Sequence, residues 1–347
     1  MFHNSESPIT LYVHIGTGKT GSTTIQSTLQ ENDLALQQEG VKYLGLMLDT
    51  GYSQQFDWQT PAGFTLFQEL GEEEKKRQLV KVLVDECRYW SEQGCNKLVW
   101  SHEAIFNAPD DFSPALQAVE LLGIKVVPIV YIRNHVSWAL SAYKQWGIKH
   151  KTYEGQIMTF EEWCNSKSLS FMPYLLPWAE RMGGSLRVRN FDKCPSLMAD
   201  FYSILELSIE LLESRKNTTP SDSVLSLWAS FNNQFEEQVS PGMFYQTLGR
   251  LGITEYNDIK GVDYKSCLAS EDNVNQLADM YAHDLEAINY FMDLQGQPLL
   301  EHTTQAPKTD LKMEDSMAVM LTMIVALENQ VAALRNHIEH IEQRDRK

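Results

Sequence analysis

The sequence predicts an α/β fold with a mainly parallel central sheet flanked by helices, then a helical C-terminal half and a C-terminal coiled-coil helix. Three observations predict this architecture. Short apolar runs alternate with helical stretches over roughly the first 195 residues, as in strand–helix–strand units. The chain beyond that point reads as helical, and residues 313–347 carry a heptad repeat.

Five short apolar runs have the character of buried strands. They are residues 9–15, 41–46, 97–101, 125–132 and 185–191. Helical stretches separate them or follow the last one. These are residues 22–38, 72–94, 134–147 and 160–182, and later 195–214, 222–238 and 270–293. The alternation predicts one domain over residues 1–295, with its sheet in the N-terminal part.

Composition narrows the class of protein. A chain of 347 residues that is 43% hydrophobic can bury a large core. Its formal net charge of −17 argues against a general nucleic-acid binder, which would carry a basic surface. The five cysteines show no CxxC or paired spacing, which predicts reduced thiols. No secretory signal and no apolar run of membrane-spanning length are recognised, so we expect a cytoplasmic protein without a membrane span.

The C-terminal tail is expected to be a separate unit. Residues 296–312 are polar and carry two prolines, as a linker would. Beyond them, apolar residues follow a strict spacing of three and four: Met317, Met320, Ile324, Leu327, Val331, Leu334, Ile338 and Ile341. β-Branched residues at one core position with leucine at the other favour a parallel dimer, although Leu321 and Met323 widen the apolar face. We therefore predict a homo-oligomer; the alternative is a terminal helix that packs on its own domain.

The loop at residues 16–24 has the composition of an anion site. It follows the first strand and precedes a helix, whose unpaired N–H groups and dipole favour an anion. Gly16, Gly18 and Gly21 permit close approach to the backbone, and Lys19 supplies a positive charge. Hydroxyl donors follow at Thr20, Ser22, Thr23 and Thr24. A phosphate loop in this place predicts a P-loop-like sheet.

Two common nucleotide motifs fit this loop less well. Residues 16–21 satisfy GxGxxG, but the acidic residue expected at the end of the second strand is not convincing, because Asp49 lies late. A Walker loop needs a glycine five positions before Gly18, where the chain has Val13. Both readings therefore fail on spacing or on chemistry.

A third pattern matches at two places. Lys19-Thr20-Gly21-Ser22-Thr23 resembles the 5′-phosphosulfate loop of the sulfotransferases that use 3′-phosphoadenosine 5′-phosphosulfate (PAPS), whose core is K-[ST]-G-[ST]-T. The segment IVYIRNHVSWALSAY, residues 129–143, looks like the 3′-phosphate element of the same family. It has Arg133 at a strand end and Ser141 eight residues later, and both side chains can bond to a phosphate. The family often has proline and aspartate where this chain has His135 and Ser137.

The strand at 97–101 ends in Ser101-His102-Glu103, at the sheet edge where doubly wound folds bind ligands. Sulfuryl transfer to an alcohol needs a base for the hydroxyl proton. His102 follows a hydroxyl residue, which resembles the catalytic histidine of cytosolic sulfotransferases, whereas several glycan sulfotransferases use a glutamate, as Glu103 would be. We place His102 first and keep Glu103 as the alternative.

The resemblance covers roughly residues 9–293 and implies a sulfotransferase of the bacterial glycan-modifying type. It implies PAPS as sulfuryl donor, adenosine 3′,5′-bisphosphate (PAP) as product, no metal, and a carbohydrate or other hydroxyl acceptor. Lys19 would bind the donor and stabilise charge on the bridging oxygen. The alternatives are a P-loop kinase or other phosphotransferase, which needs Mg²⁺, and a nucleotide-binding scaffold without turnover. A basic group after the second element, Lys144 to Lys151, is either a solvated helix end or a rim that attracts an anion.

Overall fold

The computed structural model describes residues 9–207, 222–244, 264–303, 305–306 and separate positions between 313 and 338. Contacts between Cα atoms divide the chain into two compact units. The first unit comprises Met1–Trp138, Leu169–Thr218 and Leu277–Thr303, and the second comprises Ala139–Ser168, Thr219–Gln276 and Thr304–Lys347. The sheet and the glycine-containing loop both belong to the first unit.

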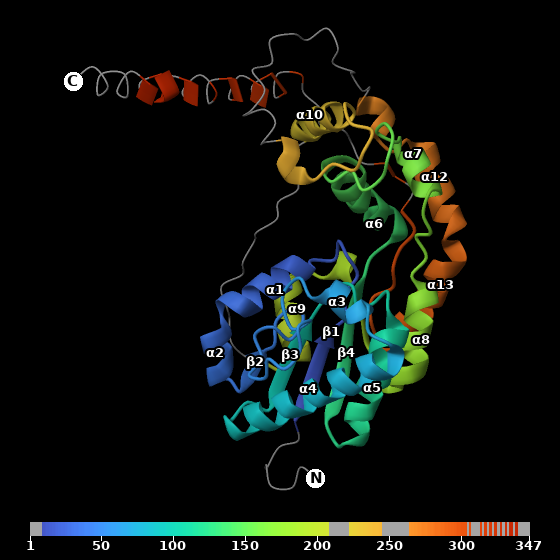
Figure 1. Ribbon diagram of the computed structural model, residues 1–347. Helices are drawn as coiled ribbons and strands as arrows, with labels where there is room; N and C mark the ends of the chain where they lie inside the picture. Colours follow the sequence, from blue (N-terminus) through green and yellow to red (C-terminus); the bar gives the residue numbers. More distant parts are fainter. Residues whose placement is uncertain are drawn as a thin grey trace, which may run out of the picture. The chain divides into compact units, whose positions relative to one another are not determined.

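The predicted α/β fold with its parallel sheet is confirmed. Five strands pair in the order β2-β3-β1-β4-β5, and every pairing is parallel, so the first strand lies at the centre (Figure 1). Their bounds are β1 Thr10–His14, β2 Val41–Tyr43, β3 Lys97–Ser101, β4 Lys125–Ile132 and β5 Arg187–Asn190. Each lies within or coincides with a predicted segment, because strands buried on both faces read as continuous apolar runs.

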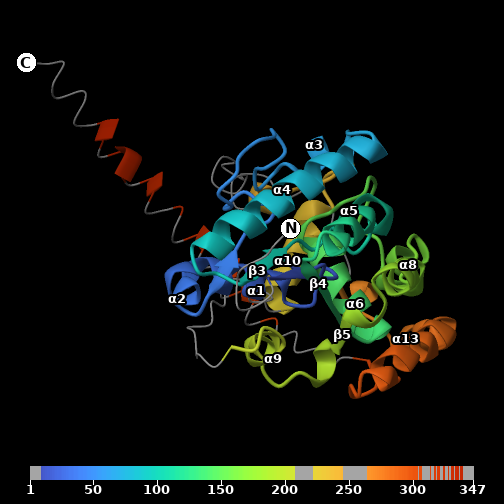
Figure 2. The ribbon, with the colours of Figure 1, turned by 90° about the horizontal axis from the view of Figure 1, so that it is seen from below.

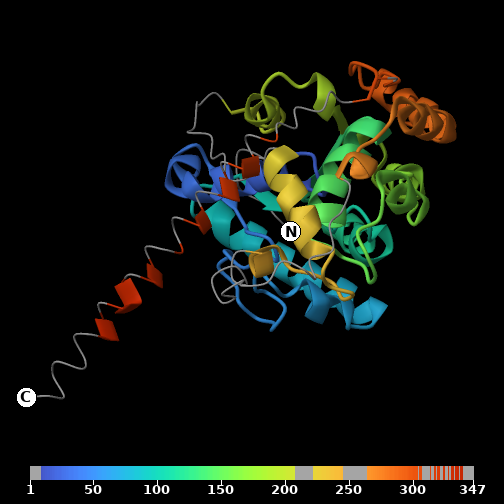
Figure 3. The ribbon, with the colours of Figure 1, turned by 90° about the horizontal axis from the view of Figure 1, so that it is seen from above.

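Helices cover both faces of the sheet. Two clusters of buried side chains, one on each face, join the strands to different helices. One face packs against α4 Glu72–Glu92, α5 Pro109–Leu121, α8 Met172–Met182 and α13 Ala282–Leu294. The other packs against α1 Ser22–Glu31, α2 Asp33–Gln38 and α9 Leu197–Ile204. Views from the two ends keep α4 and α9 on opposite sides of the sheet (Figures 2 and 3).

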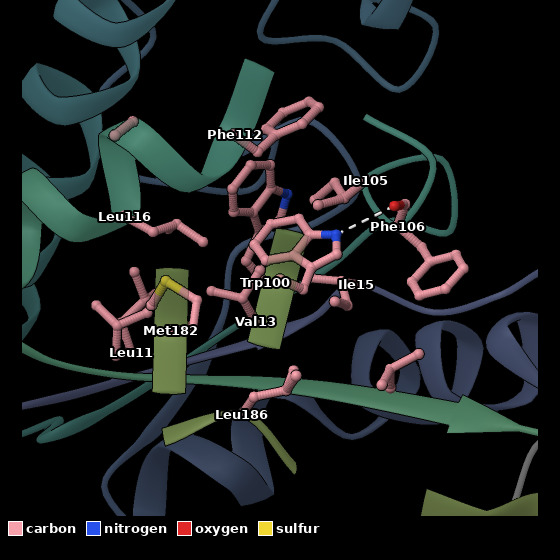
Figure 4. Close-up of a cluster of buried hydrophobic side chains, with 14 of the residues drawn as sticks. Leu11, Val13, Ile15, Trp100, Ile105, Phe106, Phe112, Leu116, Met182 and Leu186 are labelled. Atoms are coloured by element: carbon pink, nitrogen blue, oxygen red, sulfur yellow. Dashed lines mark hydrogen bonds between the residues drawn. The ribbon is translucent and has the colours of Figure 1, made fainter. Parts of the chain in front are cut away.

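Aromatic residues dominate the larger of the two clusters. Trp100 of β3 is fully buried and contacts Phe112 of α5 edge-on (Figure 4). Its indole N–H donates to the carbonyl oxygen of Leu46 at 2.7 Å. Trp178 of α8 donates in the same way to the carbonyl oxygen of Phe106 at 3.1 Å. Buried indoles therefore satisfy their N–H groups while they anchor helices to the sheet.

Two helices of the first unit were not predicted. α5 begins with Pro109, which a first helical turn tolerates, but it also contains Pro114, and two prolines obscured it in the sequence. The other is the short α3, Phe64–Gln68. The predicted helix 22–38 is in fact two, α1 and α2, divided at Asn32, whose side chain donates to the carbonyl oxygen of Thr28.

The second unit is helical in its described part. α6, His135–Ala142, enters it from the first unit and continues as a π-helical segment, Tyr143–Lys149. The other elements are α7 Phe160–Asn165, α10 Asp222–Asn232, a 3₁₀ turn Tyr264–Cys267 and α12 Glu271–Met280, whose last residues belong to the first unit. Of the predicted segment 222–238, residues 222–232 form α10, and of the segment 195–214, residues 197–204 form α9 of the first unit. Residues 208–221 lie outside the described residues.

The predicted linker and tail are described only in part. The first residues of the 296–312 segment are packed, because Asn190 donates to the carbonyl oxygens of Pro298 and Leu299, and Leu300 is buried. The described positions between 313 and 338 are helical. No helix in the described ranges is both long and apolar enough to cross a membrane.

Candidate anion-binding and catalytic site

The loop between β1 and α1 adopts a tight, left-handed course. Gly16, Lys19 and Gly21 have φ angles of 38°, 69° and 81°. The Thr17 hydroxyl donates to the carbonyl oxygen of Tyr131 on β4 at 2.9 Å, and the Thr20 hydroxyl donates to the carbonyl oxygen of Thr17 at 2.6 Å. A lysine in this region costs roughly 1–2 kcal/mol, and such residues cluster at ligand sites.

Gly21 is required where the loop enters α1. A Cβ atom there would lie 2.3 Å from Cδ2 of Leu197 on α9, and the φ angle disfavours any other residue as well. The close packing of the loop on α9 therefore explains the glycine of the K-T-G-S-T motif in physical terms. The hydroxyl residues Ser22, Thr23 and Thr24 then form the first turn of α1.

Arg133, directly after β4, is bonded to the loop. Its Nη1 donates to the carbonyl oxygen of Lys19 at 3.3 Å, and its Nη2 lies 3.2 Å from a carboxylate oxygen of Asp192. The guanidinium also lies 5.2 Å from the ring centre of Phe191. Trp138 donates from its indole to the carbonyl oxygen of Gly18 at 2.7 Å. The two predicted elements, residues 16–24 and the strand end at Arg133, are thus side by side.

Ser141 is the predicted site residue that the structure does not join to this group. It lies on α6, which Asn134 caps by accepting the N–H of Val136 at 2.9 Å. Ser141 belongs to the second unit, whereas Arg133 belongs to the first. Its role beside Arg133 therefore stays a prediction. His135, one of the departures from the family pattern, is bonded to Asp284 of α13 at 2.8 Å.

His102 follows β3 and is held on several sides. Its backbone N–H donates to the carbonyl oxygen of His14 at 3.1 Å, and its ring stacks on Phe64 with centres 5.1 Å apart. Its Nδ1 accepts the N–H of Ala104 at 3.1 Å, so the neutral ring carries its proton on Nε2. Burial lowers the pKa of His102 to about 4, against the opposing charge of Asp49. The ring is uncharged at neutral pH.

The Glu103 side chain is exposed to solvent, and the charge of Lys19 acts on it. Partial desolvation of its carboxyl group raises the pKa of Glu103, and the positive charge of Lys19 lowers it in part. The positive charge of the β1–α1 loop therefore acts on a carboxylate that follows β3, at the carboxyl edge of the sheet. Asp49, by contrast, is bonded to its own loop, where it accepts the N–H groups of Leu46 and Met47 at 2.7 and 3.0 Å.

A buried polar group beneath the loop was not predicted. His14 is fully buried, and its Nδ1 lies 2.7 Å from the Ser101 hydroxyl. Burial lowers the pKa of His14 to about 3, so its ring is neutral. Three polar atoms at the loop are buried without a hydrogen-bond partner among the described residues: His14 Nε2, Ser22 Oγ and Arg133 Nε. Such atoms are rare in folded proteins and mark places where a ligand or a functional contact is expected.

The basic group after α6 is held inside the second unit. Lys144 forms an ion pair of 3.0 Å with Asp222, and Lys149 lies over the ring of Trp228 at 5.5 Å. Lys151 is fully buried and donates to the carbonyl oxygens of Phe235 and Glu237. These contacts favour a structural role for the three lysines. In the described part of the chain, no group of three or more His, Cys, Asp or Glu side chains is arranged to hold a metal ion.

Comparison with known proteins adds little. No protein-family model matches the chain, and no curated protein matches it. One similar solved structure, "Crystal structure of APE1195", is 17% identical, covers 59% of this chain and 99% of its own, and has a TM-score of 0.31. Another, from the PezAT chromosomal toxin-antitoxin system of Streptococcus pneumoniae, is 16% identical. That match covers 70% of this chain and 85% of its own and has a TM-score of 0.24. Similarity this low carries no inference about function.

Proposed function

We propose that this chain is a PAPS-dependent sulfotransferase that transfers a sulfuryl group to a hydroxyl of an acceptor and releases PAP. One observation carries the proposal. Lys19 stands in a left-handed loop at the N-terminus of α1, its carbonyl oxygen is bonded to Arg133, and its charge acts on Glu103. A cation for the donor, a second cation beside it and a base candidate thus occur in one place, as sulfuryl transfer requires.

The residues around the loop suit an anionic donor. The first N–H groups of α1 and the hydroxyls of Ser22, Thr23 and Thr24 would hold the 5′-phosphosulfate. The Thr20 hydroxyl, also predicted to bind the donor, is already bonded to the carbonyl oxygen of Thr17. Ser22 Oγ and Arg133 Nε are buried donors that find no partner among the residues the structure describes, which supports an anionic ligand in contact with both segments. Arg133 is also paired with Asp192, so the 3′-phosphate would share the guanidinium with that carboxylate.

The proposed reaction is an in-line displacement. The acceptor oxygen forms a bond to sulfur while the bond from sulfur to the phosphate oxygen breaks, and the hydroxyl proton passes to the base. Lys19 stabilises the negative charge that develops on the departing phosphate oxygen, because a fixed positive charge in a site with little water interacts strongly with it.

Glu103 suits the role of base better than His102. The neutral His102 ring has its Nδ1 lone pair engaged with the Ala104 N–H, and its Nε2 already carries a proton. Its pKa of about 4 also makes it a weak base. Glu103 is exposed and has a raised pKa, so its carboxylate is a stronger base than an ordinary one.

One observation favours the alternative of a P-loop kinase or other phosphotransferase. Glu103 follows β3, which pairs directly with β1, and an acidic group there is placed to hold Mg²⁺ beside a phosphate. Dependence on Mg²⁺ distinguishes the two reactions. A carbohydrate acceptor rests on the sequence resemblance alone and a cytoplasmic location on the unpaired spacing of the cysteines, and both remain part of the proposal.

The proposal is tested by incubating the chain with ³⁵S-labelled PAPS and a panel of glycans, with EDTA present. We expect transfer of label to a hydroxyl acceptor and stoichiometric PAP. Transfer of phosphate from ATP that requires Mg²⁺, with no transfer from PAPS, would replace this proposal by the alternative.

We also propose that the tail assembles the chain into a parallel dimer. Seven apolar residues at the heptad spacing are each 46–73% exposed, namely Met313, Met317, Met320, Ile324, Val331, Leu334 and Ile338. A helix with such a face gains stability by pairing with a second copy.

Deleting residues 313–347 should therefore halve the mass measured by light scattering and leave the first unit folded. Val331→Asp with Leu334→Asp should do the same, because a charge in the seam is desolvated on pairing. Ala333→Asp, on the exposed outer face, is the matched control and should keep the dimer. An unchanged mass after deletion would rule out assembly through the tail.

A further inference from the structure

A chain of polar side chains, buried except for the half-buried Gln26, connects α1 to the ends of two strands. His14 and Ser101 are the last residues of β1 and β3 and pair in register. The His14 Nδ1 lies 2.7 Å from the Ser101 hydroxyl, and Gln26 donates to the same hydroxyl at 3.3 Å. Gln26 stands one helical turn after Ser22, on the same face of α1. The network therefore reaches from the strand before His102 to the second turn of α1.

The other ring nitrogen of His14, Nε2, and the Ser22 hydroxyl both lie close to Gly16. A Cβ atom on Gly16 would lie 3.3 Å from His14 Nε2 and 3.1 Å from Ser22 Oγ. Both atoms are buried, and neither has a hydrogen-bond partner within the described part of the chain. Two unsatisfied polar atoms directed at one glycine carry a desolvation penalty each, which a stable core would normally avoid.

The hydrogen bonds of Ser101 bear on which nitrogen of the His14 ring carries the proton. Ser101 accepts a hydrogen bond from Gln26 and can at the same time donate its own proton to Nδ1 of His14. The proton of the ring then lies on Nε2. The ring is neutral, since burial lowers the pKa of His14 to about 3. His14 thus presents an uncharged N–H donor towards the oxygen of Ser22.

We propose that His14 is a positioning residue for the anion site: its Nε2–H donates to Ser22 Oγ across Gly16 when an anion binds, and so turns the Ser22 proton towards the anion. The inference rests on the proposed function for the identity of the anion, a phosphosulfate or phosphate group. Gly16 suits the arrangement, because a Cβ atom there would crowd both atoms and the φ angle of 38° disfavours any other residue. Because the His14 ring is neutral, it does not attract the anion to a position beneath the loop. A charged imidazolium there would compete with Lys19 for the anion.

Two substitutions of His14 distinguish the role of its Nε2 from that of its Nδ1. The amide of glutamine reaches about as far as Nε2, and that of asparagine only about as far as Nδ1. His14→Gln should keep affinity for PAP within about threefold of wild type, and His14→Asn should weaken it about tenfold, the effect of one lost hydrogen bond to a charged group. Affinity is measured by calorimetry, and the melting temperature of each variant is recorded alongside. A role confined to core packing would make both variants bind alike wherever they fold.

A double-mutant cycle tests the link to Ser22. Ser22→Ala alone should weaken PAP binding about tenfold, and adding His14→Asn should weaken it little further, because both changes remove the same contact. Ser113→Ala is the matched control, since this buried serine on α5 is bonded elsewhere, to the carbonyl oxygen of Pro109 at 2.7 Å. It should lower stability and leave PAP affinity unchanged. Additive losses of about a hundredfold in the double variant would overturn the proposal.

The cycle also separates this inference from the proposed function. If the wild-type chain binds ATP in place of PAP, the sulfotransferase assignment fails, and the same variants are measured with ATP. Coupling between His14 and Ser22 there would still support the positioning role. If PAP binds and the coupling is absent, only the positioning role fails. Binding of neither nucleotide would overturn both.

Discussion

Replacing Lys19 with alanine is expected to lower the rate of sulfuryl transfer by about 10²–10³-fold, the usual effect of removing one preorganised group that stabilises transition-state charge. The backbone of Lys19 is held in a left-handed conformation, with its carbonyl oxygen bonded to Arg133, and its charge acts on the base candidate Glu103. The initial rate of PAP release, measured at saturating PAPS, gives the change in turnover. PAP affinity should fall as well, because the same cation binds the donor.

Lys81→Ala is the matched control for this experiment. Lys81 lies on α4, is half exposed, and forms only a surface ion pair of 2.8 Å with Asp85. Such pairs contribute about 0–1 kcal/mol, so this variant should keep both activity and stability. Near-normal turnover of Lys19→Ala would show that the loop does not hold the donor.

Replacing Glu103 with glutamine should lower turnover by about 10²–10⁴-fold while PAP affinity changes little, because only the proton acceptor is lost. His102→Asn should have a much smaller effect, since its ring is stacked on Phe64 and its proton-accepting nitrogen is engaged. The two substituted residues are neighbours in the sequence, so each variant serves as the control for a general disturbance of this segment by the other. A large loss in His102→Asn with none in Glu103→Gln would restore the order predicted from the sequence.

The pH dependence follows from the pKa of Glu103. A base must be deprotonated, so turnover should fall as pH drops through that pKa, which lies above the ordinary value for glutamate because the carboxyl group is partly desolvated. Lys19 lowers the pKa of Glu103, so Lys19→Ala should raise it further. A ¹³C titration of the Glu103 carboxyl in both proteins measures this shift directly. An unchanged pKa would mean that the two charges do not interact.

Much of the fold was predictable because its strands are buried on both faces and are bounded by loops. The run at 125–132 coincides with β4, and the run at 97–101 coincides with β3. Helix α5 was missed because Pro114 lies inside it, and the break at Asn32 was missed because the apolar periodicity continues across it. The division into two units depends on long-range contacts that local patterns do not encode.

The site was predictable where spacing alone carries the signal. The sequence indicated the K-T-G-S-T loop and Arg133, and the structure brings them together. The role of His14 could not be predicted from the sequence. Its partner Ser101 is identified only when the register of β1 against β3 is known. The preference between His102 and Glu103 depended likewise on one backbone N–H, that of Ala104, which a sequence does not reveal.

Calorimetric titration of the intact chain with PAP, ATP and NAD tests the central claim most directly. The loop, Lys19 and Arg133 predict binding of PAP in the absence of Mg²⁺, with ATP and NAD at least tenfold weaker, a difference of about 1.4 kcal/mol. Lys19→Ala and Arg133→Ala should each weaken PAP binding in the same experiment. Preference for ATP or NAD over PAP would contradict the account.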